Sequence, residues 1–478
     1  MKRFVCLSGL VLIPLTGFAG WTHTFGQDQD DVGYCVQETS DGGYIIAGHS
    51  GITMGGWIIK TDAHGDAIWT SAPFGFGGGT AYSITETSDG NYVATGFQAM
   101  YDDGKYHLAL VKLNPQGQEV WFKIDADWVG HDSSGGIGYS VHQTPDGGYV
   151  VAGSRQPFIF TDTIDVWLIK TDSAGELEWE KKHGGLPQDV GRCVRSTSDG
   201  CYIIAGYTEY STPSSPWSYW VLKTDDEGDT VWISGMPDWY FGRAYWVEET
   251  SDDGFISAGY VFPFEDGKHH LFLLKMDSEG DTLWSRMDLD WLAENGGDAR
   301  CVRETSDGGF IVSGFRANWY EEIEDLWLIK TDMNADTQWT RIYGGSQEDM
   351  SHCVSQTADG GFIVVGATSS LGSGGYDVWL VKTDAQGDTV SVSEGPQIIT
   401  GNLDIPVSIG QEIVLKYSNH SRGFHAQIFD ASGRKADEIH SPLSQGAIRW
   451  GEGFDAGVYF IEALSSEGRE TRKVVLIR

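Results

Sequence analysis

The segment ETSDGGYIIAG, residues 38–48, recurs along the chain in seven related copies. Its turn aspartates follow one another at intervals of 48 to 57 residues: Asp41, Asp89, Asp146, Asp199, Asp252, Asp307 and Asp359. Each copy precedes a second phrase of the type DVWLIKTDxxGDxxW, whose lysines are Lys60, Lys112, Lys170, Lys223, Lys275, Lys330 and Lys382. A fixed period of about fifty residues indicates a repeat architecture.

Each unit contains four short strands, which we name A to D. In the first unit they are predicted at residues 34–39, 44–48, 57–61 and 67–69. The A–B turn is SDGG, where glycine supplies the positive φ of a tight hairpin, and in the C–D turn an aspartate can close an Asx-turn. Seven such units predict an all-β fold, a seven-bladed β-propeller. A linear solenoid is the alternative.

The tryptophan of strand D indicates a closed ring. Six units carry it, but the seventh has Val390 in its place. The missing residue is found near the other end of the chain as Trp21, which precedes Asp41 by 20 residues, the same spacing as Trp69 to Asp89. Residues 21–25 are therefore predicted to be a displaced strand D that completes the seventh blade.

The composition excludes several classes of protein. The chain has 32 Lys and Arg against 68 Asp and Glu, a net charge of −36, so binding to nucleic acid or to an anionic membrane is not expected. Hydrophobic residues reach 40% and aromatic residues 13%, enough to bury a core and to exclude disorder.

The cysteines do not indicate a disulfide framework. Apart from Cys6 there are five, an odd number without the spacing of a metal site. Four occupy one repeat position on strand A, and we interpret them as small buried hydrophobic residues: Cys35, Cys193, Cys301 and Cys353.

The N-terminus predicts export. Lys2 and Arg3 precede an apolar run that ends in small residues, typical of a signal peptide over residues 1–19 with cleavage between Ala19 and Gly20. No stretch of the chain is long and apolar enough to predict a transmembrane segment.

The last part of the chain is a separate domain. Residues 396–478 carry 9 basic and 10 acidic residues, so nearly all the negative charge belongs to the propeller at residues 20–393. Residues 394–478 are predicted to be a linker and a small β-sandwich-type domain. Its motifs are QIFDASGR at 427–434, Trp450 followed by AGVYF at 456–460, and RKVVLIR at 472–478.

These motifs resemble the type A C-terminal sorting domain of the type IX secretion system. The resemblance implies export through the periplasm and across a Gram-negative outer membrane, with the secretion machinery as a partner, and release or attachment at the cell surface. The propeller phrases resemble those of uncharacterised secreted bacterial propellers, which imply no catalytic residues.

Residues repeated in every blade are expected to be structural, because an active site needs only one copy. This applies to the seven lysines of strand C, which we expect to pair with nearby turn or strand acids. It also applies to the strand-D tryptophans, which we expect to pack between blades. The seven threonines before the A–B turns belong to the same class: Thr39, Thr87, Thr144, Thr197, Thr250, Thr305 and Thr357.

The loops that differ are the candidates for ligand binding. The A–B and C–D turns are short and uniform, so the face they form is expected to be nearly featureless, whereas the D–A and B–C connections vary on the opposite face. The predicted ligand-binding residues are Asp127, Trp128, Asp238, Trp239, Asp290, Trp291, Trp319 and Tyr320. Rings beside carboxylates suit a glycan or a protein ligand; the alternative is that they cover the small cores of the loops.

Enzymatic activity is the second hypothesis. Two carboxylates at a suitable separation could hydrolyse a glycoside, and the candidates are Asp125, Asp127, Asp288 and Asp290. No catalytic triad, phosphate loop or metal-type histidine pair is found, so no catalytic residue, metal or cofactor is assigned. Calcium at the TDxxGD turns, such as Asp62 and Asp66, remains an alternative to a capped hairpin.

Overall fold

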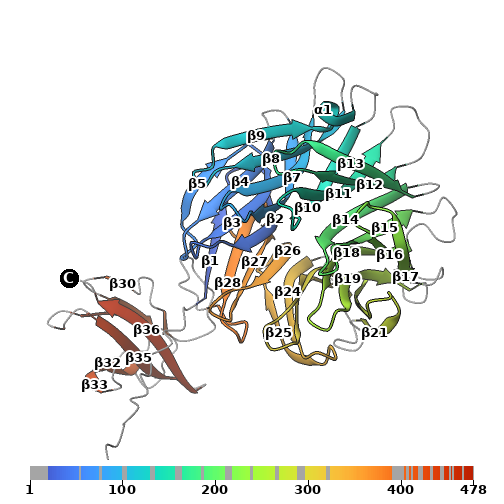
Figure 1. Ribbon diagram of the computed structural model, residues 1–478. Helices are drawn as coiled ribbons and strands as arrows, with labels where there is room; N and C mark the ends of the chain where they lie inside the picture. The colour runs from blue at the N-terminus through green and yellow to red at the C-terminus, as the bar shows by residue number, and fades with distance from the viewer. Residues whose placement is uncertain are drawn as a thin grey trace, which may run out of the picture. The chain divides into compact units, whose positions relative to one another are not determined.

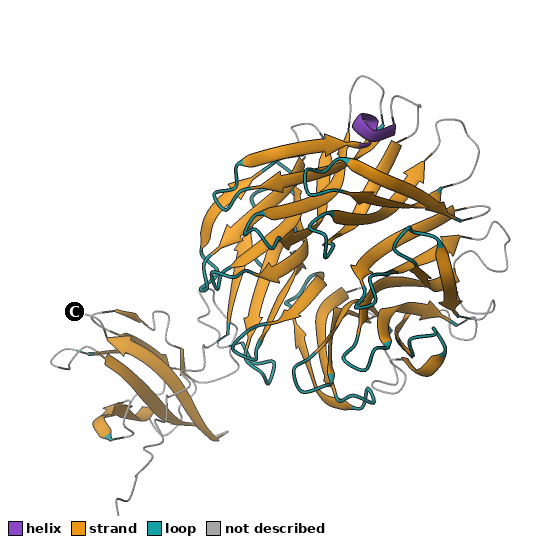
Figure 2. Cartoon of the chain, viewed as in Figure 1, coloured by secondary structure: helices purple, strands orange, loops and turns teal. Residues whose placement is uncertain are grey.

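The computed structural model is a seven-bladed β-propeller followed by a smaller β unit (Figure 1). The two compact units span residues 1–391 and 392–478. Strands dominate, with one short helix, α1 (Asp125–Val129), among the described residues (Figure 2). In the first unit the structure describes residues 20–389 except 53–54, 75–77, 100–104, 130–134, 157–163, 185–187, 210–217, 237–240, 264–267, 288–295 and 319–322. In the second it describes 403–404, 409–410, 413–417, 424–430, 434–441, 446–451, 454, 457–465 and 468–476.

Six blades are antiparallel sheets of four consecutive strands, A to D in chain order. The first three consist of β2 (Asp31–Glu38), β3 (Tyr44–Ser50), β4 (Gly55–Thr61) and β5 (Ala67–Ser71); β6 (Gly79–Glu86), β7 (Tyr92–Ala99), β8 (Tyr106–Leu113) and β9 (Glu119–Ile124); and β10 (Gly135–Gln143), β11 (Tyr149–Gln156), β12 (Asp165–Thr171) and β13 (Leu177–His183). The next three consist of β14 (Gln188–Ser196), β15 (Tyr202–Glu209), β16 (Ser218–Thr224) and β17 (Thr230–Gly235); β18 (Phe241–Glu249), β19 (Phe255–Phe262), β20 (His270–Met276) and β21 (Thr282–Met287); and β22 (Gly297–Glu304), β23 (Phe310–Asn318), β24 (Ile323–Thr331) and β25 (Thr337–Tyr343).

The seventh blade combines both ends of the propeller. Its strands A to C are β26 (Asp349–Gln356), β27 (Phe362–Thr368) and β28 (Asp377–Thr383), and its strand D is β1 (Trp21–Phe25). Trp21 pairs with Lys382 in the same register in which Trp69 pairs with Lys60 in blade 1. The predicted displaced strand is therefore confirmed, and the ring is closed by hydrogen bonds between the first and last strands.

The strand-D tryptophan of each blade packs on the next blade. Its ring lies 5.7 to 6.1 Å, between centroids, from the aromatic ring that begins strand B of that blade, and this contact occurs at all seven interfaces. The same tryptophan lies against the C–D turn of the next blade: a Cβ on Gly117 would be 2.6 Å from the ring of Trp69. Gly117 also has a φ of +76°, so both its conformation and its neighbour require glycine.

The A–B turn is built around its aspartate. In blade 6, Thr305 Oγ1 donates to Asp307 Oδ1 at 2.6 Å, and the backbone N–H of Gly309 donates to the same oxygen at 3.1 Å. The buried Lys330 reaches Asp307 from strand C at 3.0 Å. The same lysine–aspartate pair occurs in all seven blades, so the repeated lysines and threonines are structural as predicted.

A second contact links each A–B turn to the following blade. The backbone N–H of Ser40 in blade 1 donates to Glu86 at the end of strand A of blade 2, at 2.7 Å. Five other interfaces have the equivalent bond, with Ser88, Ser198, Ser251, Ser306 and Ala358 as donors. Between blades 3 and 4 the position of the donor is taken by Pro145, which has no N–H. There the N–H of Ser196 in blade 4 donates to Nδ1 of His142 on strand A of blade 3, a bond of the kind that Glu86 also makes to Gln37.

Strand A of every blade contains a β-bulge, which places two adjacent side chains on the channel side of the sheet. The second of the two is the cysteine position. Cys35, Cys193, Cys301 and Cys353 are at most 9% exposed, and each thiol donates to a carbonyl of strand A in the next blade. Their interpretation as small buried residues is confirmed.

The C-terminal unit consists of two sheets that share one core. The first contains β29 (Leu403–Asp404), β31 (Ile413–Tyr417) and β34 (Gly446–Trp450), and the second β30 (Ile409–Gly410), β36 (Gly468–Leu476), β35 (Gly457–Ser465), β32 (Phe424–Asp430) and β33 (Lys435–Ser441). Ile413 and Trp450 of the first sheet pack in one cluster with Ile428 and Ile461 of the second. This is the predicted sandwich-type arrangement.

Replacing Trp21 by alanine is expected to lower the free energy of unfolding by about 2 kcal/mol, because the half-buried ring is lost from the closing blade and from Tyr44. Chemical denaturation measures this loss. The control is Ile68→Ala on the outer strand of blade 1, where the side chain is 59% exposed and a change within about 0.5 kcal/mol is expected. Equal stability of the two variants would contradict the role of β1 in closure.

The turn aspartates make the propeller sensitive to acid. Burial raises the pKa of Asp307, but hydrogen bonds from Thr305, Lys330 and the Gly309 N–H outweigh it and lower the pKa to about 2. The pKa of the equivalent carboxyl is lowered in all seven blades. A lowered pKa stabilises the fold above the ordinary value of 3.8, and this contribution is lost as the pH falls toward 2.

The free energy of unfolding is therefore expected to fall between about pH 4 and pH 2. Asp307→Asn should cost about 1.5 kcal/mol at pH 7, because buried Lys330 loses its charged partner, and should flatten the dependence on pH. Asp226→Asn, on an exposed C–D turn, is the control and should leave the profile unchanged. Chemical denaturation curves measured from pH 7 to pH 2 test this prediction. A wild-type free energy of unfolding that does not decrease below about pH 4 would show that the turn aspartates do not make the fold sensitive to acid.

Candidate functional site

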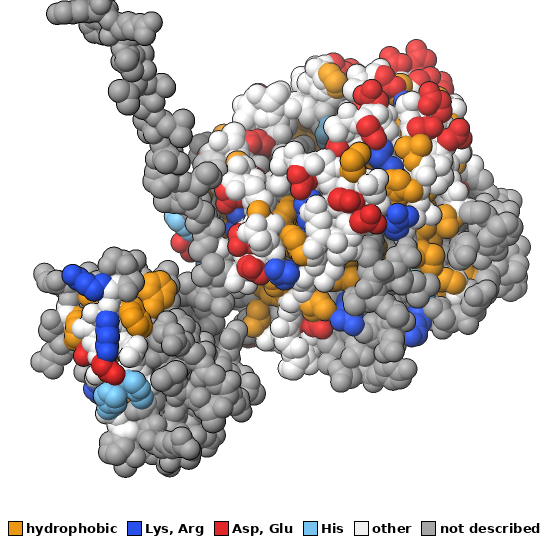
Figure 3. Space-filling model, turned by 90° about the horizontal axis from the view of Figure 1, so that it is seen from below, with side chains coloured by type: hydrophobic (Ala, Val, Ile, Leu, Met, Phe, Trp, Pro, Cys, Tyr) orange, Lys and Arg blue, Asp and Glu red, His pale blue; other side chains and the backbone are white. Residues whose placement is uncertain are grey.

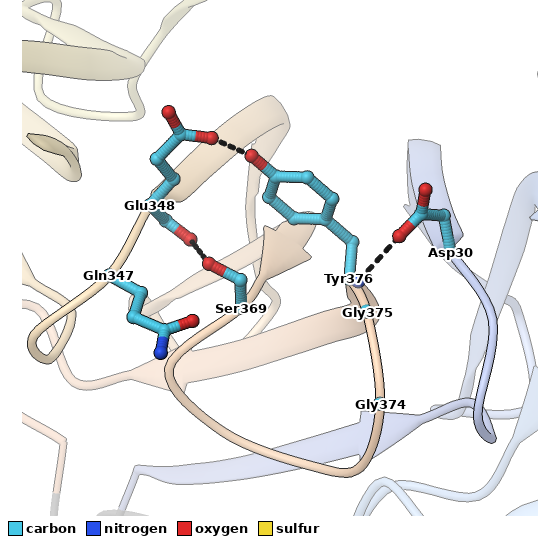
Figure 4. A pocket seen from close by; sticks show the side chains of 7 residues that line it. All are labelled: Asp30, Gln347, Glu348, Ser369, Gly374, Gly375 and Tyr376. Carbon is cyan, nitrogen blue, oxygen red and sulfur yellow. Dashed lines mark hydrogen bonds between the residues drawn. The ribbon is translucent and has the colours of Figure 1, made fainter. Parts of the chain in front are cut away.

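The D–A and B–C connections form one face of the disc, and on this face the loops of blades 6, 7 and 1 line an open pocket of about 350 Å³. The lining comes from the D–A loop before blade 1, the D–A loop before blade 7 and the B–C loop of blade 7. The residues are Asp30, Gln347, Glu348, Ser369, Gly374, Gly375 and Tyr376 (Figure 4). The pocket exists because β1 brings the N-terminal loop beside blade 7.

Tyr376 is the aromatic residue of this pocket. Its hydroxyl donates to the carboxylate of Glu348, and its backbone N–H donates to Asp30 Oδ1 at 3.0 Å (Figure 4). Ser369 Oγ donates to the Glu348 carbonyl at 2.9 Å and holds the two loops together. The half-buried ring thus lies between two carboxylates that come from different blades.

Buried carboxylates beneath the pocket hold these loops in place. Asp31 accepts from the backbone N–H of Gln27 and of Gly51, both at 3.1 Å. Asp349 accepts from the Gly345 N–H and from Ser370 Oγ, both at 2.7 Å.

A further buried carboxylate, Asp377, accepts from the Ser373 N–H at 2.7 Å. Burial raises the pKa of Asp377, and the nearby charge of Asp31 raises it further. The loops around the pocket are therefore fixed by the scaffold, and only the residues above them face solvent.

This arrangement suits a hydroxylated or cationic ligand. Carboxylates accept hydrogen bonds from hydroxyl groups, and an aromatic ring offers a flat apolar surface or a cation–π contact. The exposed Gln347 adds an amide that can both donate and accept.

None of the pocket residues is among the ligand-binding residues predicted from the sequence. A weak signal was available: a glycine five residues before a buried aspartate occurs in three D–A loops, as Gly26 and Asp31, Gly184 and Asp189, and Gly344 and Asp349. It marks loops of fixed shape, not the residues that face solvent above them.

Of the predicted ligand residues, Asp127 and Trp128 lie within the described part of the chain. Asp127 Oδ2 accepts from the Ile124 N–H at 3.0 Å, which fixes the start of α1. The ring of Trp128 packs against the cluster around Tyr149 and Trp167, and its Nε1 donates to the Gly175 carbonyl of blade 3 at 3.0 Å. Both side chains make contacts that shape the loop and its blade interface.

The other predicted ligand residues lie outside the described residues: Asp238, Trp239, Asp290, Trp291, Trp319 and Tyr320. Ala19 of the predicted cleavage site and the candidate carboxylate Asp288 do so as well. The remaining carboxylate, Asp125, is 3% exposed and lies 2.5 Å from His107 Nδ1, so it serves the packing of α1 on β8.

The TDxxGD turns are capped hairpins. Asp62 Oδ1 accepts from the backbone N–H of His64 at 2.8 Å and of Asp66 at 3.0 Å. The Asx-turn interpretation is thus confirmed.

Among the residues that the structure describes, one group has the composition of a metal site, and it lies in the C-terminal unit. His425, Glu438 and His440 place their ligand atoms within 4.8 Å of one another on β32 and β33. Two imidazoles and a carboxylate are ligands that zinc accepts. The three side chains lie at the surface, and Lys435 also pairs with Glu438.

Comparisons with known proteins assign no family to this chain. No family model matches the chain, and no curated protein matches its sequence. Among solved structures, PorZ, a surface component of the type IX secretion system of Porphyromonas gingivalis, is 10% identical, with 95% of this chain and 60% of that chain covered and a TM-score of 0.45. A puromycin hydrolase is 14% identical, with coverage of 90% and 58% and a TM-score of 0.49.

A third similar structure is the β-propeller domain of the Trilobed protease from Pyrococcus furiosus. It is 9% identical, with coverage of 79% and 99% and a TM-score of 0.42. The chain spans about 60% of the length of PorZ. None of these similarities assigns an activity. None of the described helices is long and apolar enough to cross a membrane.

Trp128→Ala is expected to lower the free energy of unfolding by about 2 kcal/mol, because the ring is part of a blade interface. Trp128→Phe should cost about 1 kcal/mol through loss of the bond to Gly175. Val120→Ala on β9, where the side chain is 53% exposed, is the control. Thermal unfolding measures these changes. A Trp128→Ala variant as stable as the control would contradict the packing role and make Trp128 a candidate ligand-binding residue again.

Proposed function

We propose that this chain is an exported propeller that works outside the cell as a binding module for a glycan or protein ligand. The pocket around Tyr376 carries the proposal, because a ring flanked by Glu348 and Asp30 stands on loops that buried aspartates hold rigid. A preorganised polar pocket binds a ligand without first paying the entropy of ordering its loops.

The two ends of the chain support the proposed location. The charge and apolar pattern of residues 1–19 is that of a signal peptide. The motif residues of the C-terminal unit lie on neighbouring strands, since Phe429 of β32 pairs with Phe460 of β35, and Phe460 pairs with Lys473 of β36. A folded C-terminal unit with these motifs is consistent with a type IX sorting domain that delivers the propeller to the cell surface or the medium.

The test is a glycan-array screen of the full chain without residues 1–19, beside Tyr376→Ala and Glu348→Gln. Both variants should bind the glycan with an affinity lower by about tenfold or more. Tyr376→Ala removes the ring on which a sugar stacks, and Glu348→Gln removes the carboxylate that accepts from its hydroxyl groups. Glu227→Gln, an exposed carboxylate on a C–D turn of the opposite face, is the matched control and should bind as the wild type does.

Binding that both pocket variants retain would place the ligand elsewhere on the disc. If the array shows no binding, the glycan class is excluded. A protein ligand is then sought by crosslinking to intact cells, with Tyr376→Ala as the comparison.

A further inference from the structure

A second cavity of about 350 Å³ lies on the propeller axis, where the A strands end at the A–B turns. Each blade contributes one channel-facing residue to its wall: Gln37, Thr85, His142, Arg195, Glu248, Arg303 and Ser355. The expectation that this face is nearly featureless is therefore wrong at its centre. The error arises because the turns are uniform whereas the channel position of strand A differs in each blade.

Three residues before the wall positions, aromatic rings meet around the axis at the bulge of the A strands. The rings of Tyr34, Tyr82 and Tyr139 follow one another at 5.0 and 5.1 Å between centroids. The guanidinium of Arg300 stacks on Tyr245 at 4.2 Å. The cavity is thus a socket that opens toward the A–B turns.

Several wall residues use their acceptor atoms to bind the neighbouring blade. The bonds run from Glu86 N to Gln37 Oε1 at 2.9 Å, from Ser196 N to His142 Nδ1 at 3.3 Å and from Glu304 N to Glu248 Oε1 at 2.7 Å. Since the oxygen of Gln37 is occupied, its amide N–H groups are the atoms that remain for the socket.

His142 also offers a donor. Burial, together with the charges of Arg195 and Arg303, lowers the pKa of His142 to about 3, so the imidazole is neutral at pH 7. Its Nδ1 accepts from Ser196, which assigns the proton to Nε2.

Two arginines complete the wall. Arg195 and Arg303 stack on Trp246 from the blades on either side of it, at 4.3 and 4.4 Å. Arg303 is paired with Glu248 at 2.9 Å, and its buried Nε has no hydrogen-bond partner among the described residues. Arg195 bonds to the Val194 carbonyl at 2.7 Å and has no carboxylate partner within the described part of the chain.

Each carboxylate oxygen of the wall already accepts one hydrogen bond. Glu248 accepts from Arg303 and from the Glu304 N–H, and Glu304 accepts from the N–H and hydroxyl of Ser251. The formal charges of two arginines and two glutamates cancel, and the N–H donors of Arg195, Gln37 and His142 remain for a ligand in the socket.

We propose that this socket binds a small oxyanion, a phosphate or carboxylate group, through Arg195, Gln37 and His142. A guanidinium and neutral N–H donors match the geometry of such a group, and charge-assisted hydrogen bonds are the strong ones. Large polyanions are excluded, because acidic side chains predominate on the propeller surface that Figure 3 views and the chain carries a net charge of −36. The proposal is independent of the Tyr376 pocket, which lies on the opposite face.

The test is isothermal titration of the full chain without residues 1–19 with sodium phosphate and, separately, with sodium citrate at an ionic strength held constant with sodium chloride. The informative variant is Gln37→Glu, which keeps the acceptor for Glu86 but replaces the donor in the socket by a carboxylate. The matched control is Gln143→Glu, whose Oε1 accepts from the Ser88 N–H at the position where Glu86 and Glu249 serve in other blades.

Wild type and Gln143→Glu should bind one of the two anions, and Gln37→Glu should bind it at least about tenfold more weakly. The anion that binds distinguishes a phosphate from a carboxylate ligand. No heat with either anion, or equal binding by the two variants, would overturn the proposal. If Gln37→Glu does not fold, Arg195→Lys takes its place, because it keeps the charge but removes the planar fork, and unchanged affinity would again refute the site.

Discussion

The pairing of β1 with β28 is the contact on which the rest of the propeller depends. Each blade is a four-stranded sheet that buries its faces only against its two neighbours, so a row of blades has two open ends unless it closes. Trp21 provides blade 7 with the ring that contacts Tyr44 of blade 1, as the other strand-D tryptophans do for their neighbours. Closure thus converts six equivalent interfaces into seven.

Closure also explains why repeated and variable residues have different roles. Positions such as Lys330, Asp307 and Thr305 face the same surroundings in every blade, so the same residue types and the same hydrogen bonds recur seven times. Around the axis, by contrast, seven side chains meet in one place, and identical residues there would crowd or repel one another. The wall of the socket therefore contains amide, hydroxyl, imidazole, carboxylate and guanidinium groups.

The two candidate sites lie on opposite faces and use different chemistry. On the face of the variable loops, acceptors surround Tyr376, and buried aspartates support the loops from below. On the axis, Gln37 and His142 each use an acceptor atom in a contact between blades, which leaves their N–H donors for the cavity. A ligand rich in hydroxyl or cationic groups suits the first site, and an anionic group suits the second.

The repeat itself was sufficient to predict the blades, the displaced strand at Trp21, the pairing of the repeated lysines with nearby acids and the burial of Cys353, because these depend on spacing and on residue types that recur. The role of Trp128 was left open, since its ring could equally have faced solvent. The structure decided this, because Gly175 of the neighbouring blade lies within reach of its Nε1.

The sequence by itself therefore determined the architecture of this protein, and tertiary structure decided its sites. Strands, turns and blade number follow from local patterns that repeat every fifty or so residues. Asp30, Glu348 and Tyr376 belong to three separate loops, and Gln37, His142 and Arg195 to three different blades. Asp30 joins Glu348 and Tyr376, and Gln37 joins His142 and Arg195 around one cavity, only when the ring closes, because these residues lie far apart along the chain and outside the repeated positions.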